Sequence, residues 1–256
     1  MIELRFLGTG SLGDKRPKNK LSKDYRRFPT LLIGSELLID PSEDIFEFVE
    51  SFSFFGLLDS VKDVLITHSH LDHLSVSAIE ELAGRSGLRV WASAPVLNTI
   101  GDIKGVRRLE IVPFSRFSVG DFDIIALPAN HATDDVREVA LNFLIRRDKT
   151  LLYALDGAGI NPHAFEVLKE VTLDGCVFDC ALADGEYSVE SVNHNNLDAV
   201  KTIIDILTKA GCCTDGTKHI ISHLPSSKKL GLHDRLTALL EDTAIKVAYD
   251  GYYICI

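Results

Sequence analysis

Cysteine is scarce in this sequence, and its spacing excludes two common roles. The 256 residues include five cysteines, namely Cys176, Cys180, Cys212, Cys213 and Cys255. The number is odd and no pair has Cys-x-x-Cys spacing, which argues against a disulfide framework and against a Cys₄ zinc site. We therefore expect reduced, mostly buried thiols.

The chain also lacks a net positive charge and a long apolar run. Its 27 Lys and Arg residues are outnumbered by 37 Asp and Glu residues, giving a formal net charge of −10. This argues against a large nucleic-acid partner, because such binders have a basic surface. The sequence contains no apolar run of 18 residues, so we predict no membrane span. The first residues enter a strand pattern directly, and we predict no signal peptide. We expect a cytoplasmic protein, as a monomer or a homodimer.

The remaining composition is that of an ordinary globular protein, with 46% hydrophobic and 25% charged residues. No repeat, low-complexity segment or linker divides the chain, so we predict a single domain over residues 1–256. Predicted strands and hairpins followed by a helix occur twice in succession. This order favours an α/β fold in which two sheets pack face to face, with helices outside and a site at one edge.

The most informative segment is Thr67–His73, which follows the apolar run Val64–Ile66. On an extended chain, side chains two residues apart point the same way, so His68 and His70 can bind one ion. Asp72 and His73 lie just past the bend and can reach a second. Imidazoles and carboxylates suit Zn²⁺, Mn²⁺ or Fe, and two-metal centres are known hydrolytic devices. Chance clustering explains the segment poorly, because the chain has only nine His.

Further metal ligands are predicted at the ends of later strands. His131, Asp156 and His223 each follow an apolar strand and lie beside Gly, Pro or a small residue. Singly, each is more often a structural or surface residue than a ligand. Together with the first segment, they would complete a two-metal site.

In order and spacing, these residues resemble the ligand pattern of the metallo-β-lactamase superfamily over nearly the whole chain. The resemblance implies an αββα four-layer sandwich of two mixed sheets, with helices on the outer faces and a dinuclear metal centre. It implies that one metal is held by His68, His70 and His131, and the other by Asp72, His73 and His223. Asp156 would bridge the two metals, and Asp72 would also count as a catalytic residue.

Other segments resemble the phosphodiesterase branch of that superfamily, in particular the phosphoribosyl 1,2-cyclic phosphate phosphodiesterases of phosphonate breakdown. They are residues 7–10, 25–27, 127–128, 130–131, 156–159, 178–180, 193–194, 196–197, 221–223 and 249–251. In that branch the histidine at the position of His194 acts as a general acid near the leaving group. Histidine suits proton transfer near neutral pH. The alternative that His194 is a cap or surface residue near a helix start stays open.

The segment Asp14–Arg27 departs from that branch, which carries there a cysteine cluster that holds a structural zinc. Here the segment has no Cys and is rich in Lys and Arg. Most of it is best interpreted as a solvated loop, whereas Arg26 and Arg27 adjoin the next strand and are the predicted substrate contacts. Asp40 and Asp179, at strand ends, are predicted to orient ligand histidines.

These features together predict a metal-dependent hydrolase of a small anionic phosphodiester, cyclic forms included. A hydroxide held by two Zn²⁺, Mn²⁺ or Fe ions would attack phosphorus, and His194 would protonate the departing alkoxide. A tRNase Z-like ribonuclease has similar ligands. That enzyme grips tRNA with a protruding arm, whereas this sequence shows no Gly/Pro-rich insertion for one, and the net negative charge is unfavourable for RNA binding. Thioester or lactone hydrolysis of the glyoxalase II type and a non-enzymatic metal-binding scaffold also remain open.

Overall fold

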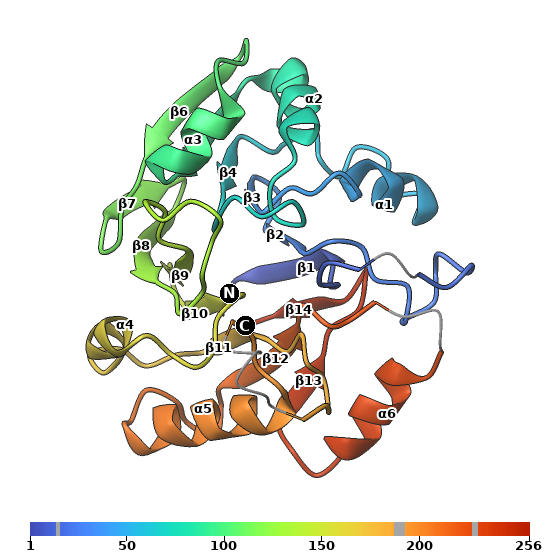
Figure 1. Ribbon diagram of the computed structural model, residues 1–256, viewed down its shortest axis with the longest axis vertical. Helices are drawn as coiled ribbons and strands as arrows, with labels where there is room; N and C mark the ends of the chain where they lie inside the picture. Colours follow the sequence, from blue (N-terminus) through green and yellow to red (C-terminus); the bar gives the residue numbers. More distant parts are fainter. Residues whose placement is uncertain (14–15, 187–192, 227–229) are drawn as a thin grey trace.

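Two 7-stranded β-sheets pack face to face, and helices cover the outer face of each. The computed structural model describes residues 1–13, 16–186, 193–226 and 230–256. Figure 1 shows α1, α2 and α3 on one side of the sheets, with α5 and α6 on the other. The predicted αββα sandwich is therefore confirmed. None of the described helices is long and apolar enough to cross a membrane.

The first sheet is built from the N-terminal half of the chain and closed by the last strand. Its strand order is β14-β1-β2-β3-β4-β5-β6. The strands are β14 (Tyr253–Cys255), β1 (Glu3–Gly8), β2 (Thr30–Ile33), β3 (Leu37–Ile39), β4 (Asp63–Leu65), β5 (Leu88–Ala92) and β6 (Val106–Glu110). The helices are α1 (Ile45–Ser51), α2 (Val76–Ser86) and α3 (Ala94–Ile100).

The second sheet is built from the C-terminal half, with the order β13-β12-β11-β10-β9-β8-β7. The strands are β13 (Ile245–Val247), β12 (Lys218–Ser222), β11 (Gly175–Asp179), β10 (Thr150–Ala154), β9 (Leu141–Arg146), β8 (Phe122–Pro128) and β7 (Arg116–Val119). The helices are α4 (Pro162–Leu168), α5 (Leu197–Lys209) and α6 (Leu232–Leu239).

The central strands are apolar on both faces because each face is covered. In β10, Leu151 and Tyr153 belong to the core between the two sheets. Leu152 and Ala154 belong to the core between the second sheet and its helices. Successive side chains of a strand alternate between faces, so a strand buried on both sides appears in the sequence as an unbroken apolar run.

Each sheet combines antiparallel hairpins with a parallel group of strands. In the first sheet β3, β4, β5 and β6 are parallel neighbours. In the second sheet β10, β11, β12 and β13 are parallel neighbours. The carboxyl ends of parallel strands meet at one edge of a sheet, and ligand sites typically lie there. Six of the seven predicted metal ligands follow strands of these parallel groups, so the topology brings them to one edge. His131 follows β8, which pairs antiparallel with β9.

Arg26 and Arg27 do not have the predicted environment of substrate contacts. Both side chains are 0% exposed, and neither lines the cavity beside the metal ligands. Arg26 Nη1 donates to Thr9 Oγ1 and to the Ala248 carbonyl, each at 2.9 Å. Arg27 Nη1 donates to Asp250 Oδ2 at 3.1 Å. The two guanidiniums therefore tie the N-terminal segment to the C-terminal segment. Asp14 and Lys15, which begin the basic run, lie outside the described residues.

We expect Arg27→Ala to lower the free energy of unfolding by about 3–5 kcal/mol, because it leaves Asp250 buried without its cation. Burial already raises the pKa of Asp250 to about 6, and Arg27 opposes that rise. Without Arg27 the pKa of Asp250 in the folded chain should rise further above its value in the unfolded chain, so ionisation of Asp250 destabilises the variant more than the parent chain. The loss of stability should therefore be larger near about pH 8 than near about pH 5. Urea unfolding at both pH values measures it.

Lys20→Ala is the matched control, because Lys20 pairs with Glu47 at the surface. Exposed ion pairs contribute little, so this variant should unfold like the parent chain. Equal losses in the two variants, or a loss in Arg27→Ala that shrinks as the pH rises, would contradict the buried-pair interpretation.

Candidate metal centre

Three imidazoles and one carboxylate converge at the edge where the parallel strands end. They come from the loop after β4 (His68 and His70), from the segment after β8 (His131) and from the segment after β10 (Asp156). His70 Nδ1 lies 2.9 Å from His68 Nε2 and 3.1 Å from His131 Nε2. Asp156 Oδ2 lies 3.5 Å from His68 Nε2 and 3.4 Å from His131 Nε2.

The spacing of these donor atoms fits a small cation. Ligand bonds of about 2.0–2.1 Å in a tetrahedron place neighbouring donors about 3.3 Å apart. The four contacts between these donors span 2.9 to 3.5 Å. The structure therefore brings His68, His70, His131 and Asp156 together in an arrangement suited to one metal ion.

A second group of donors lies beside the first. His223 Nε2 is 3.2 Å from Asp72 Oδ2 and 3.4 Å from His73 Nε2. His73 Nε2 is 3.7 Å from Asp72 Oδ2. All three side chains are buried. This group of two imidazoles and one carboxylate suits a second ion.

Asp156 belongs to both groups. Its Oδ2 lies 3.3 Å from His73 Nε2 as well as near His68 and His131. Its Oδ1 is buried and has no hydrogen-bond partner in the described part of the chain, although it lies 3.2 Å from His223 Nδ1. A buried carboxylate oxygen without a donor is costly unless a cation binds it. The position of Asp156 therefore suits a carboxylate that two cations could share.

The backbone is strained where three of these side chains leave their strands. Asp40 follows β3 with φ of 52°, Asp156 lies beyond the end of β10 with φ of 54°, and His223 follows β12 with φ of 57°. Residues other than glycine rarely adopt this left-handed region, and such strain is concentrated at functional sites. The turn at each strand end aims the side chain along the sheet edge into the site.

Oxygen acceptors contact the Nδ1 atoms of several ligand histidines. Asp40 Oδ2 lies 2.9 Å from His73 Nδ1, and Asp179 Oδ1 lies 3.0 Å from His223 Nδ1. Such contacts set the tautomer and orientation of a ligand imidazole. The predicted positions of Asp40 and Asp179 next to ligand histidines therefore agree with the geometry.

The remaining acceptors were not predicted. Thr67 Oγ1 lies 2.9 Å from His68 Nδ1, and the Asn193 carbonyl lies 3.1 Å from His131 Nδ1. No sequence signal marks a backbone carbonyl as an acceptor. Thr67 could have been predicted from the sequence, because it directly precedes the first ligand. Its side chain also donates to Asp40 at 2.8 Å.

The electrostatic field of the centre favours positive charge. Burial alone would lower the pKa of His223, but Asp156, Asp179 and Asp72 raise it to about 10. Burial likewise opposes ionisation of Asp72, yet His73 and His223 leave its pKa below the usual range. Burial and the neighbouring His73 lower the pKa of His68, which keeps that imidazole neutral, the form that binds metal.

His194 lies at the open side of the centre. Its Nδ1 is 3.2 Å from Asp179 Oδ2, so Asp179 contacts both His194 and His223. Its side chain is 28% exposed, and its ring centroid is 5.2 Å from that of His131. The alternative role of helix cap is filled by Asn196, whose side chain accepts from the Ala199 amide at the start of α5.

The family model of the beta-lactamase superfamily domain matches residues 35–234 of the sequence. The chain belongs to the metallo-β-lactamase superfamily. Comparison with curated protein sequences gave no match.

Several solved structures share this fold at low sequence identity. The metallo-β-lactamase fold protein YhfI of Bacillus subtilis has a TM-score of 0.74 and 15% identity, with 100% of both chains covered. Zn²⁺-bound PqqB of Methylobacterium extorquens has a TM-score of 0.77 and 15% identity, covering 99% of this chain and 100% of that one. Unliganded yeast PDE1 has a TM-score of 0.66 and 13% identity, covering 100% and 99%.

The metal centre of this metallo-β-lactamase superfamily protein opens into a cavity of about 750 Å³. His70, Asp72 and His194 line it, together with the apolar side chains of Leu12 and Leu71. Leu12 is 67% exposed and Leu71 is 79% exposed. Neither was predicted, although Leu71 lies within the histidine segment. An apolar rim around a charged floor suits a ligand that carries both kinds of group.

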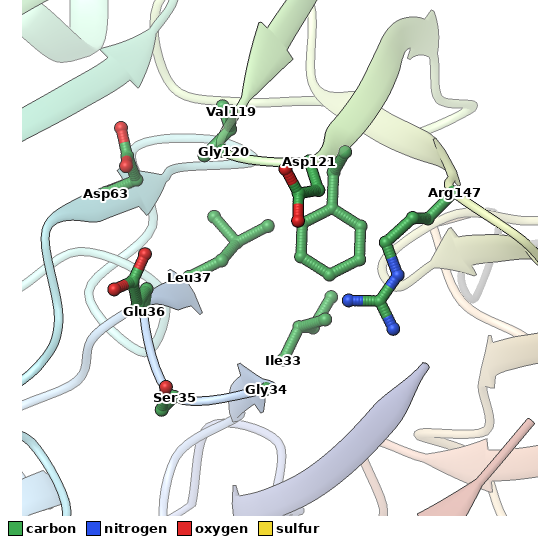
Figure 2. A pocket seen from close by; sticks show the side chains of 11 residues that line it. Ile33, Gly34, Ser35, Glu36, Leu37, Asp63, Val119, Gly120, Asp121 and Arg147 are labelled. Carbon is green, nitrogen blue, oxygen red and sulfur yellow. The ribbon is translucent and has the colours of Figure 1, made fainter. Parts of the chain in front are cut away.

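A smaller cavity of about 210 Å³ lies at the opposite end of the sheets and contains none of the metal ligands. Figure 2 shows it between the β2–β3 turn at Gly34 and the β7–β8 turn at Gly120, with Asp63 and Arg147 at its sides. Asp63 Oδ2 already accepts from Arg89 Nη2 at 2.6 Å. The seven predicted metal ligands therefore lie away from this cavity.

Proposed function

We propose that this metallo-β-lactamase superfamily protein hydrolyses a small phosphodiester, cyclic forms included, with two divalent cations. The observation that carries the proposal is the position of His194. It lies beside the two groups of metal ligands and is held by Asp179, which also contacts the ligand His223. A proton donor at this place suits an alkoxide leaving group, which must be protonated as it departs.

The donor set assigns a role to each residue. His68, His70 and His131 would hold one cation, Asp72, His73 and His223 the other, and Asp156 both. Bound there, Zn²⁺, Mn²⁺ or Fe would supply a nucleophile at neutral pH and would neutralise charge on the phosphoryl oxygens. Asp179 fixes the ring of His194 through Nδ1, which leaves Nε2 to give its proton to the leaving oxygen.

The size of the cavity supports a small substrate. A volume of about 750 Å³ is within the range of sites for small molecules. Leu12 and Leu71 at the rim would contact the apolar part of an ester group, and His194 would contact the leaving oxygen. The net charge of −10 supports a small anion, bound at the local positive site, over a long polyanion.

The test is hydrolysis of bis(p-nitrophenyl) phosphate and of a panel of cyclic and linear phosphodiesters by protein loaded with Zn²⁺ or Mn²⁺. We expect turnover that EDTA abolishes and that added metal restores, because both groups of ligands must be filled. Turnover of a glutathione thioester without any phosphodiester would move the assignment to acyl hydrolysis. Metal-loaded protein that is inert toward every ester would favour the binding scaffold.

A further inference from the structure

A second cluster of metal-ligating side chains lies in the second sheet, toward the end away from the metal centre. Cys176 in β11 and His219 in β12 are neighbours in the parallel register of these strands. Cys213 follows α5 and reaches the same point. One ligand atom from each residue lies within 4.8 Å of the others. Asp179 and His223 of the metal centre occur three and four residues later, at the opposite end of the sheet, where Asp179 is the last residue of β11 and His223 follows β12.

The cluster is buried and incompletely bonded. Cys176 is 0%, Cys213 4% and His219 5% exposed. The His219 ring stacks on Phe178 with a centroid distance of 6.3 Å, and its Nδ1 has no hydrogen-bond partner among the residues that the structure describes. Buried polar atoms without partners are rare in native proteins and cost free energy. This nitrogen therefore points to a ligand.

The chemistry of the cluster selects one class of cation. Thiolates and imidazole are the donors preferred by soft and borderline cations such as Zn²⁺. Two thiolates cancel the charge of a divalent cation, and a neutral imidazole adds none. The resulting complex is electrically neutral, which suits the apolar layer around Cys176 and Cys213. A monovalent cation would leave a buried negative charge.

We propose that Cys176, Cys213 and His219 form a separate binding site for a thiophilic divalent cation, Zn²⁺ or its analogues. The three side chains occupy three positions of a tetrahedron, and water takes the fourth. The bound ion ties the segment after α5 to strands β11 and β12, so its role is to stabilise this end of the sheet. The site is independent of the proposed phosphodiesterase activity.

The His219 imidazole supports metal binding over a structural disulfide. Contact between the two thiols lowers the pKa of Cys213, whereas burial and the same contact raise the pKa of Cys176, so an incoming cation has to displace the Cys176 proton. Oxidation of Cys176 and Cys213 to a disulfide would leave His219 Nδ1 without a partner. A cation uses all three groups at once.

Titration of the reduced full-length protein with Co²⁺ tests the site. The seven ligands of the dinuclear centre are nitrogen and oxygen donors, so a thiolate-to-cobalt charge-transfer band reports the second site alone. We expect the band to saturate at one equivalent above the ions that the dinuclear centre takes, and to disappear when Zn²⁺ is added. It should persist in Asp156→Ala, which separates this proposal from the fate of the first centre.

Matched variants locate the ligands. Cys176→Ala and Cys213→Ala should lose the band, and His219→Ala should weaken binding by more than about 100-fold, because losing even an orienting group costs about 10- to 100-fold. Cys212→Ala is the control, since Cys212 is buried beside Cys213 but is not a member of the cluster. It should keep the band.

Three results would overturn the proposal. One is the absence of a thiolate band in the reduced parent protein at saturating Co²⁺, which needs no variant and so does not depend on how a variant folds. Another is a band that behaves alike in Cys212→Ala and Cys213→Ala. The third is ready formation of a Cys176–Cys213 disulfide in air by a protein that takes up no cobalt when reduced, which would identify a redox pair instead.

Discussion

Replacing Asp156 with alanine should remove hydrolysis and the paired metal binding together. Asp156 Oδ2 lies 3.3 to 3.5 Å from ligand nitrogens of both groups, so this carboxylate could hold the two ions at once. We expect kcat/KM to fall by at least about 1000-fold, because removing a single transition-state donor already costs about 100- to 1000-fold. Metal content should fall from two ions at this centre to one or none.

Turnover of bis(p-nitrophenyl) phosphate and elemental analysis of the dialysed protein measure the two effects. Asp121→Ala is the matched control, since Asp121 is a carboxylate of the cavity at the opposite end of the sheets. It should keep both metal content and activity. If Asp156→Ala retained a full complement of metal and lost only activity, the bridging role would be wrong and Asp156 would act on the substrate.

Replacing His194 with alanine should slow hydrolysis according to the leaving group. General acid catalysis contributes about 100- to 10,000-fold for an alkoxide, which is a poor leaving group until it is protonated. A p-nitrophenolate needs little protonation, so bis(p-nitrophenyl) phosphate should lose far less activity. The metal content should stay unchanged, because His194 belongs to the open side of the centre and contacts Asp179. Steady-state kinetics on an alkyl ester and on an aryl ester of phosphate reveal the difference.

Asp179→Asn separates proton donation from positioning. The Asp179 carboxylate contacts both His194 and His223. The Asp179→Asn variant should therefore reduce alkyl ester turnover and also weaken metal binding by about 10- to 100-fold. Excess metal should restore occupancy of the metal site but should not restore alkyl ester turnover. An equal loss on alkyl and aryl esters in His194→Ala would show that His194 binds the substrate and does not protonate the leaving group.

The two packed sheets and the first metal-binding segment were accessible from local patterns. The apolar runs of β4, β10 and β11 occur because both faces of these strands are covered. His68 and His70 are two residues apart on an extended chain, a spacing that places their side chains together whatever the rest of the fold does. The distant ligands followed from the order of the pattern in a resembling superfamily, and the structure brings all seven residues together.

Arg26 and Arg27 show where local reasoning failed. A basic run beside a strand suggests an anion site, yet both guanidiniums are buried and bound to groups more than 200 residues away in the chain, at Ala248 and Asp250. The start of α6 likewise depends on a residue that is far away in the sequence. Asp24 accepts from the Gly231 and His233 amides, which places the N-terminus of the helix at Leu232.

The histidine segment and the apolar strand that precedes it were thus determined by the sequence alone, because a period of two residues is a property of a short stretch of chain. The tertiary structure decided which strand ends meet, that Asp156 lies between the two groups, and that Cys176, Cys213 and His219 form a cluster. These depend on sheet register and on strained turns with positive φ, as at Asp156. Such contacts join residues far apart in the chain, and no local period encodes them.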